Sequence, residues 1–269
     1  MPTIQANDIN IYYEIHGTGK PLLLISGLGY NNWQWHKMVP GLAEHFQVIV
    51  FDNRGVGQTD KPAGPYNAAL LAADTAGLLQ ALGIAKAHIM GHSMGGFIAQ
   101  ELALSYPEMV DKLILASTNF GGPHHIPVTQ EAMAVLTDMT SDPVTRFKNG
   151  LVVSTGPGWA EANPEMIETW LAWRIENPID PTAYQAQLAI GLGLLTEAAC
   201  FENRLADIAA ETLILFGAHD KVVPPDNASL LAAKIPHNTI HILPNAGHIF
   251  PIEAPEEANR AIVEFLNRD

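Results

Sequence analysis

Short apolar runs alternate with longer amphipathic stretches along this chain. Residues 3–7 and 10–15 alternate apolar and polar side chains around Asn7-Asp8, which predicts an antiparallel hairpin. Mostly apolar runs, typical of strands buried on both faces, follow at residues 21–25, 47–51, 87–90, 112–116, 212–216 and 239–243. Apolar residues at helical spacing predict helices over residues 32–44, 66–82, 96–105, 225–233 and 255–267. This order predicts an α/β fold with a mostly parallel central sheet flanked by helices.

The alternation of strands and helices stops between Asn119 and Phe201. This stretch contains no clear buried strand, and its helical patterns are broken at Pro143, Pro164, Pro178 and Pro181. We therefore expect a helical insertion at residues 119–201 that covers the edge of the sheet. Residues 1–118 and 202–269 would together form the core.

Charge and composition narrow the class of protein. The 269 residues carry a formal net charge of −14, which argues against nucleic-acid and anionic-membrane partners. No stretch approaches the roughly 20 apolar residues of a membrane span, and residues 1–5 lack the features of a signal peptide. The single cysteine, Cys200, excludes an internal disulfide and suits a reducing compartment. We expect a cytoplasmic protein, and the sequence leaves open whether it forms a homo-oligomer.

The strongest chemical signal is Gly91-His92-Ser93-Met94-Gly95, which lies between the apolar run 87–90 and the helix expected over 96–105. A serine on a sharp strand-to-helix turn holds its hydroxyl above the sheet, and flanking glycines relieve the crowding around it. The N–H groups at the start of the helix favour negative charge at the same place. Ser93 is therefore the predicted catalytic nucleophile.

A serine nucleophile needs a base to take its proton and an acid to orient that base. Asp220 follows the strand predicted at 212–216, and His248 follows the strand predicted at 239–243. The carboxyl ends of parallel strands meet at one edge of a sheet, so these side chains should lie near Ser93. The order Ser, Asp, His is also that of enzymes with this serine turn. The predicted catalytic residues are Ser93, Asp220 and His248.

Other residues are weaker candidates for these roles. Asp226 opens a predicted helix and suits a position near its N-cap, while Asn119 has no carboxylate. His219 is interpreted as a loop residue and His92 as a packing residue. His124-His125 could suggest a metal site, but the surrounding sequence supplies no further ligands. We therefore predict no metal.

Acyl transfer also needs N–H donors for the oxyanion of the tetrahedral intermediate. The N–H of Met94, which follows the nucleophile, is one predicted donor. The second is the N–H of Leu28 in the loop Ser26-Gly27-Leu28-Gly29, where the glycines let the backbone turn toward the substrate. The same glycines could open a dinucleotide-binding turn, but Asn32 stands where the third glycine would be. We predict no cofactor.

The segment Asp52-Asn53-Arg54-Gly55-Val56-Gly57 follows the strand predicted at 47–51. One interpretation makes Arg54 a binding residue for an anion. The favoured interpretation is structural, because a tight charged turn of this kind anchors neighbouring loops by hydrogen bonds.

These motifs resemble the α/β-hydrolase fold superfamily, in particular its small cofactor-free carboxylesterases, enol-lactonases and haloperoxidase-like enzymes. The resemblance covers nearly the whole chain and is loosest at residues 119–201, which it implies to be a cap over the active site. It implies triad roles for Ser93, Asp220 and His248. A serine nucleophile argues against the dehalogenases and epoxide hydrolases of this fold. One departure is Ser26-Gly27, where the superfamily usually has His-Gly in its oxyanion loop.

The sequence supports three hypotheses of function. The first is a serine hydrolase that cleaves carboxylic esters through an acyl-enzyme. The second is an enol-lactonase, a C–C bond hydrolase or a lyase with the same triad, and the third is a small-ligand receptor on this fold. Few basic residues occur in the insertion (Arg146, Lys148 and Arg174), which favours a small, apolar or uncharged ester substrate. We expect the insertion to act on the choice of substrate rather than on the chemistry.

Overall fold

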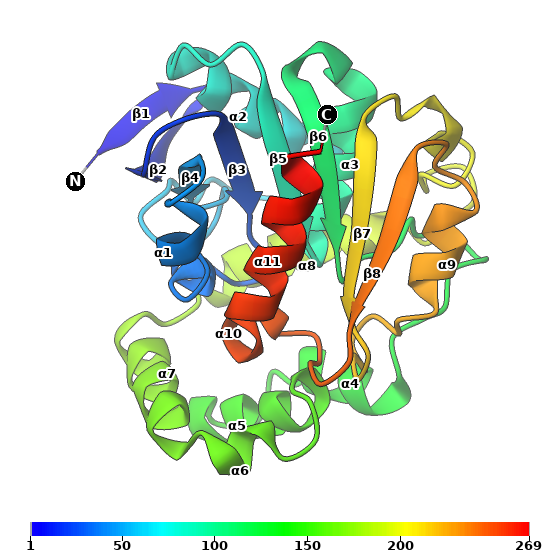
Figure 1. The fold of residues 1–269 in the computed structure, drawn as a ribbon. Helices are drawn as coiled ribbons and strands as arrows, with labels where there is room; N and C mark the ends of the chain where they lie inside the picture. The colour runs from blue at the N-terminus through cyan, green and yellow to red at the C-terminus, as the bar shows by residue number, and fades with distance from the viewer. Residues whose placement is uncertain (1, 269) are drawn as a thin grey trace.

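The central feature of the computed structural model, which describes residues 2–268, is an eight-stranded sheet with helices on both faces (Figure 1). From one edge to the other its strands are β1 (Thr3–Ala6), β2 (Ile9–His16), β4 (Gln47–Phe51), β3 (Pro21–Ile25), β5 (Ala87–His92), β6 (Val110–Ala116), β7 (Glu211–Gly217) and β8 (Asn238–Leu243). The first two pairs are antiparallel, β1 with β2 and β2 with β4, and all others are parallel. The predicted hairpin and the predicted mostly parallel sheet are confirmed.

Alternate side chains of the inner strands pack on opposite faces of the sheet. In β3, Leu23 and Ile25 join one core cluster with α2 (Ala68–Ala81) and α3 (Met94–Ser105). Leu22 and Leu24 join a second cluster on the other face, with α1 (Val39–Leu42) and α11 (Pro255–Leu266). Figure 1 shows α11 in front of the sheet and α3 behind it. This two-sided burial is the reason that the inner strands are mostly apolar.

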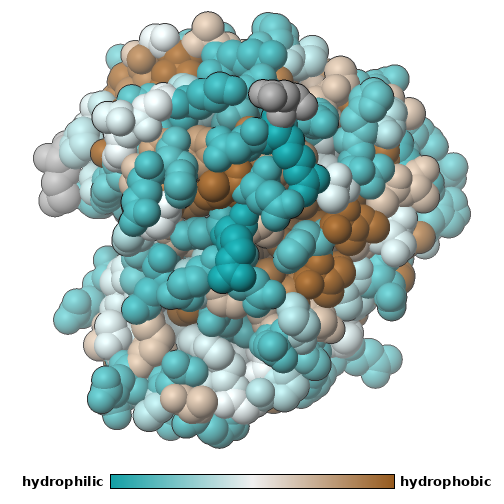
Figure 2. All heavy atoms as spheres, viewed as in Figure 1, coloured by the Kyte–Doolittle hydropathy of each residue, from teal (hydrophilic) through white to brown (hydrophobic). Residues whose placement is uncertain are grey.

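The edge strand β8 differs from the inner strands. Its residues Ile240 and Ile242 are 41% and 39% exposed, and Figure 2 shows apolar surface beside α11 over this edge of the sheet. An edge strand has a neighbour on one side only, so part of its apolar surface stays in contact with solvent.

The prediction of one helix over residues 32–44 is wrong. Residues 32–35 form a short 3-10 helix that begins after Asn31, whose side chain caps it, and α1 is a separate helix at Val39–Leu42. Pro40 lies in the first turn of α1, where its missing N–H costs no hydrogen bond. A continuous helix through Pro40 would lose a backbone hydrogen bond, so the chain begins a new helix instead. The helix predicted over 225–233 is shorter than expected, since α9 spans Asn227–Ala232.

Between β6 and β7 the chain forms α4 (Gln130–Leu136), α5 (Pro143–Ser154), α6 (Trp159–Ala162), α7 (Pro164–Glu176) and α8 (Pro181–Gly193). Three of the predicted helix breakers, Pro143, Pro164 and Pro181, are the first residues of helices. Figure 1 shows α5, α6 and α7 beyond the arrowheads of the strands, at the bottom of the view. The boundaries 119 and 201 of the insertion remain a prediction. Among residues 2–268, no helix has both the length and the apolar character needed to cross a membrane.

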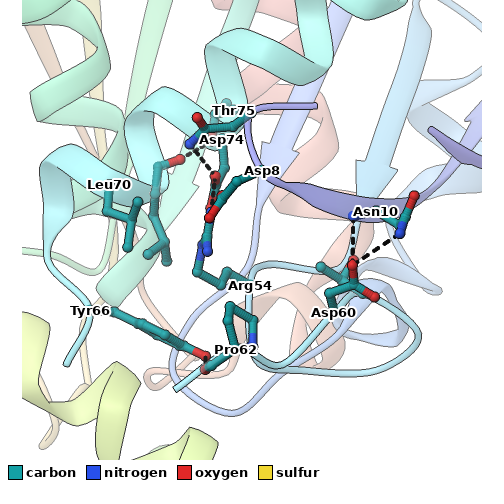
Figure 3. Close-up of polar contacts among 12 residues, drawn as sticks. Asp8, Asn10, Arg54, Asp60, Pro62, Tyr66, Leu70, Asp74 and Thr75 are labelled. Atoms are coloured by element: carbon teal, nitrogen blue, oxygen red, sulfur yellow. Dashed lines mark hydrogen bonds and ion pairs between the residues drawn. The ribbon is translucent and has the colours of Figure 1, made fainter. Parts of the chain in front are cut away.

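Arg54 lies in the turn after β4 and is only 3% exposed. Its Nε donates to Asp74 Oδ2 at 2.7 Å and its Nη2 to Asp74 Oδ1 at 2.6 Å, while Nη2 also donates to Asp8 (Figure 3). Asp74 is in α2 and Asp8 is in the hairpin turn, so one guanidinium joins three segments of the chain. The structural interpretation of Arg54 is confirmed.

We expect Arg54→Met to lower the free energy of unfolding by about 3–5 kcal/mol, because it leaves the buried carboxylate of Asp74 without its charged partner. Urea unfolding at pH 7 measures this loss. The double variant Arg54→Met, Asp74→Leu should recover part of it, since no buried charge is left unpaired and the carboxylate of Asp8 is exposed to solvent. A loss below about 1 kcal/mol in the single variant would contradict the assignment.

Candidate active site

Ser93 forms the sharp turn between β5 and α3. Its backbone φ of 55° and ψ of −120° lie outside the regions that serine ordinarily adopts. The surrounding chain holds this conformation: Ser93 N donates to Ala116 O at 2.9 Å, and Ser93 O accepts from Thr118 Oγ1 at 2.9 Å and from Gly96 N at 2.8 Å. The turn leaves the side chain of Ser93 partly exposed above the carboxyl end of β5.

Two glycines are required around Ser93 because the backbone packs too closely for a side chain. A Cβ atom at Gly91 would lie 2.2 Å from Gly95 O, and one at Gly95 would lie 2.2 Å from Ile25 O. Both distances are too short for any real contact, so the turn can form only with glycine at these positions. Steric crowding thus explains why glycine stands at both positions of the Gly91–Gly95 motif.

His248 and Asp220 form a buried pair at the carboxyl ends of β7 and β8. His248 Nδ1 lies 2.8 Å from Asp220 Oδ2, and the Asp220 side chain has no exposed surface. Asp220 Oδ1 accepts the N–H groups of Val222 at 2.9 Å and Val223 at 2.7 Å. A carboxylate surrounded by donors accepts the Nδ1 proton of His248, which leaves Nε2 free to take a proton.

The loop of His248 is fastened to the residue before Ser93. His92 Nε2 donates to the carbonyl oxygen of His248 at 2.8 Å, and the centres of the two rings are 4.8 Å apart. Burial, followed by the charge of His248, holds the pKa of His92 well below its ordinary value. A neutral, fully buried His92 fits the packing role predicted for it.

Among residues 2–268, Ser93 Oγ makes no hydrogen bond to the His248 ring, a contact that often tightens only when substrate binds.

The loop Ser26-Gly27-Leu28-Gly29 lies against Ser93. A Cβ atom on Gly27 would lie 3.2 Å from the Cβ of Ser93. The N–H groups of Gly27 and Gly29 each donate to a side chain at 2.9 Å. Within residues 2–268, the N–H groups of Leu28 and Met94 have no acceptor. The N–H groups of the two predicted oxyanion donors are thus both free in the described part of the chain.

Comparison with known proteins identifies the family. A family model described as "alpha/beta hydrolase fold" matches residues 20–255. The chain belongs to the alpha/beta hydrolase fold family. The predicted fold and the resemblance seen in the sequence are thereby confirmed.

Individual known proteins are similar to this chain over most of their length. RutD of Azorhizobium caulinodans is 30% identical over 267 residues, which cover 98% of each chain. The 2-hydroxy-6-oxononadienedioate/2-hydroxy-6-oxononatrienedioate hydrolase of Burkholderia vietnamiensis is 31% identical, with 97% of this chain and 92% of that protein covered. The structure of the meta-cleavage product hydrolase CumD from Pseudomonas fluorescens superposes with a TM-score of 0.85, at 28% identity over 99% of this chain and 97% of that one.

Ser26 stands where alpha/beta hydrolases usually have histidine in the oxyanion loop, and the structure shows how it is held. Trp35 Nε1 donates to Ser26 Oγ at 2.9 Å, and Asn53 Nδ2 donates to Ser26 O at 3.0 Å. Ser26, Trp35 and Asn53 are all buried. The loop thus keeps an anchor beneath it, made by different side chains.

The weaker candidates lie apart from the His248–Asp220 pair or serve other contacts. Asp226 is at the N-cap of α9, as predicted, although its side chain makes no capping hydrogen bond. His124 Nδ1 pairs with Glu202 at 2.8 Å, and His125 Nδ1 donates to Gly122 O at 2.6 Å. In the described part of the chain, no three His, Cys, Asp or Glu side chains are grouped to hold a metal ion.

Glu253, which sequence reasoning did not single out, lies behind the His248 loop. Its Oε2 accepts the N–H of Gly247 at 3.0 Å and that of Gly156, in the insertion, at 2.8 Å. Its Oε1 is buried and has no hydrogen-bond partner within residues 2–268. Burial raises the pKa of Glu253 to about 7. An acid five residues after the predicted base was the only local signal for this contact.

The raised pKa predicts a pH-dependent loss of stability. Between about pH 4.5 and pH 7 the unfolded chain releases the Glu253 proton while the folded chain retains it, so stability falls as pH rises. From pH 5 to pH 8 this loss is about 2 kcal/mol, and Glu253→Gln should abolish it. Urea unfolding of both proteins at the two pH values measures the difference. Equal changes in stability for wild type and variant would contradict the prediction.

Proposed function

We propose that this alpha/beta hydrolase is a serine hydrolase that cleaves carboxylic esters of small, mostly apolar or uncharged substrates through an acyl-enzyme. The observation that carries the proposal is the 2.8 Å pair of His248 and Asp220, which lies at the carboxyl ends of the parallel strands, as the strained Ser93 turn does. Ser93 is the nucleophile, His248 the base and Asp220 the orienting acid.

The geometry supports a reaction in two steps. His248 Nε2 takes the proton of Ser93 Oγ as that oxygen bonds to the ester carbonyl carbon. The carbonyl oxygen becomes an oxyanion, stabilised by the N–H groups of Leu28 and Met94. The bond to the alkoxy oxygen then breaks, and the alcohol leaves with the proton from His248. Water repeats the sequence on the acyl-enzyme, which releases the carboxylic acid and restores Ser93.

The surroundings of the oxyanion loop favour an uncharged substrate. Apolar side chains from residues 119–201 pack in one cluster with Met94 and Leu28: Ala132, Val153, Ile190 and Leu194. Arg174, one of the few basic residues there, donates to Gly29 O at 3.0 Å and lies 4.2 Å from the centre of the Tyr30 ring. Because Arg174 already has these partners, a substrate carboxylate would lose its hydration with little compensation.

C–C bond hydrolysis is the second candidate. It is favoured by the similarity to the hydrolase of Burkholderia vietnamiensis and to CumD, whose names place them among hydrolases of other substrates than simple esters. The same triad and oxyanion donors could serve that reaction, because one scaffold supports several chemistries.

A substrate panel separates the two candidates. It contains nitrophenyl esters of increasing acyl length, a charged ester, a lactone and a diketone, each assayed with wild type and Ser93→Ala. We expect kcat/KM to increase with acyl length until the pocket is filled, because each buried CH₂ lowers the activation free energy by up to about 0.8 kcal/mol. The charged ester should react poorly. Cleavage of the diketone with no Ser93-dependent ester hydrolysis would contradict the ester proposal and support the second candidate.

A further inference from the structure

Two buried glutamines hold the oxyanion loop on either side of Leu28. Gln34 Oε1 accepts the N–H of Gly27 at 2.9 Å, and Gln187 Oε1 accepts the N–H of Gly29 at 2.9 Å. Both glutamines have no exposed surface. The N–H of Leu28 lies between these two fixed groups and keeps no acceptor within residues 2–268. The loop is therefore held in a way that leaves one N–H group available.

Gln187 comes from α8 of the insertion and is itself rigidly oriented. Its Nε2 donates to the carbonyl oxygen of Arg54 at 2.9 Å, so one end of the amide must be the acceptor and the other the donor. Arg54 is fixed in turn by its hydrogen bonds to Asp74 (Figure 3). The position of the Gln187 oxygen is thus set by the core as well as by α8.

The insertion also contacts the carbonyl oxygen of Gly29 and the space around its Cα atom. Arg174 Nη1 donates to the carbonyl oxygen of Gly29 at 3.0 Å. Gly29 has a left-handed φ of 69°, and a Cβ atom there would lie 3.1 Å from Ile179 and from Tyr184. Side chains of the insertion therefore surround this end of the oxyanion loop.

We propose that Gln187 is a positioning residue for the oxyanion hole: together with Gln34 it holds the glycines beside Leu28 so that the Leu28 N–H points toward the substrate oxygen. This inference rests on the proposed function. It also revises the expectation that the insertion acts on the choice of substrate alone. A side chain of α8 would contribute to the rate of acyl transfer without touching the substrate.

The expected effect of removing Gln187 follows from what an oxyanion donor does. Loss of one such donor costs about 100- to 1,000-fold in kcat. A displaced donor keeps part of its interaction, so we expect Gln187→Met to lower kcat about 10- to 100-fold. KM should stay nearly unchanged, because the oxyanion forms only in the transition state.

The chain offers a matched control in Gln100. This glutamine also has no exposed surface, and its Nε2 donates to Gly96 O at 3.0 Å and to Asn119 O at 2.8 Å. Gln100→Met removes a buried amide with two hydrogen bonds but leaves the oxyanion loop untouched. It should destabilise the protein about as much as Gln187→Met does and keep kcat within about threefold of wild type.

Three measurements test the proposal on wild type, Gln187→Met and Gln100→Met: kcat and KM for nitrophenyl butyrate, Kd for phenylboronic acid, and melting temperature. Boron bonds to the serine oxygen and becomes tetrahedral, so this inhibitor probes the oxyanion site directly. We expect kcat/KM and the affinity for the boronic acid to fall by the same factor in Gln187→Met alone. Equal activities in the two variants, or a change confined to KM, would overturn the proposal.

Failure of the proposed function gives a different result. In that case wild type shows no Ser93-dependent hydrolysis of the butyrate ester, and amide hydrogen exchange at residues 26–29 tests the positioning role by itself. We expect faster exchange there in Gln187→Met than in Gln100→Met. Exchange rates equal to wild type in both variants would overturn the inference whatever the reaction is.

Discussion

We expect Ser93→Ala to lower kcat for the proposed ester hydrolysis by about a million-fold, the loss typical when the nucleophile of a triad is removed. Two hydroxyl groups near the turn cannot replace it. Thr118 Oγ1 donates to the carbonyl oxygen of Ser93, and Ser26 Oγ accepts from Trp35. Both are held by these hydrogen bonds, so neither can attack a carbonyl carbon bound at Ser93.

The fold of Ser93→Ala should be unchanged, because the backbone contacts that hold the turn do not involve the hydroxyl. Its free energy of unfolding should stay within about 0.5 kcal/mol of wild type, and urea unfolding provides that control. Turnover of a nitrophenyl ester within tenfold of wild type would exclude Ser93 as the nucleophile.

Asp220→Asn should lower kcat about 10,000-fold, because it reverses the tautomer of His248. The N–H groups of Val222 and Val223 occupy one side of the Asp220 carboxylate, so the oxygen of an asparagine would face them. The asparagine NH₂ would then face His248 Nδ1, which lies 2.8 Å from Asp220 Oδ2 in wild type. Nδ1 would have to accept, which moves the proton to Nε2 and prevents it from acting as a base.

This loss should appear in kcat with little change in KM, since Asp220 does not contact the substrate in the proposed reaction. Asp226→Asn is the matched control, because Asp226 lies six residues further along the chain, at the N-cap of α9. Its kcat should stay within about threefold of wild type. A loss below about 100-fold in Asp220→Asn would contradict the orienting role.

Features encoded over short distances in the sequence were predictable. The run that became β3 is apolar throughout, and that of β5 is largely so, because their side chains pack on both faces of the sheet. The Ser93 turn was recognisable because strand, serine, glycines and helix are contiguous. The order of the strands likewise predicted that Asp220 and His248 lie close together, because both follow parallel strands at their carboxyl ends.

Contacts between distant segments could not be predicted from local patterns. Gln187 is 158 residues from Gly29, and nothing around it in the sequence marks it as the acceptor for that N–H. Glu253 contacts Gly156, 97 residues away. In the sequence it is one of several acidic residues in the C-terminal region, and nothing marks it as the partner of that N–H. The prediction of one helix over residues 32–44 was wrong because apolar spacing does not show that a proline begins a new helix.

Covalent labelling tests most directly whether Ser93 is an activated nucleophile. A fluorophosphonate reacts with an activated serine by losing fluoride, which leaves a stable phosphonyl group on the oxygen. Peptide mass spectrometry should find one such group per chain, on Ser93, with ester hydrolysis lost in proportion to labelling and the label absent from Ser93→Ala. Label on another residue, or ester hydrolysis that survives complete labelling of Ser93, would contradict the proposed mechanism.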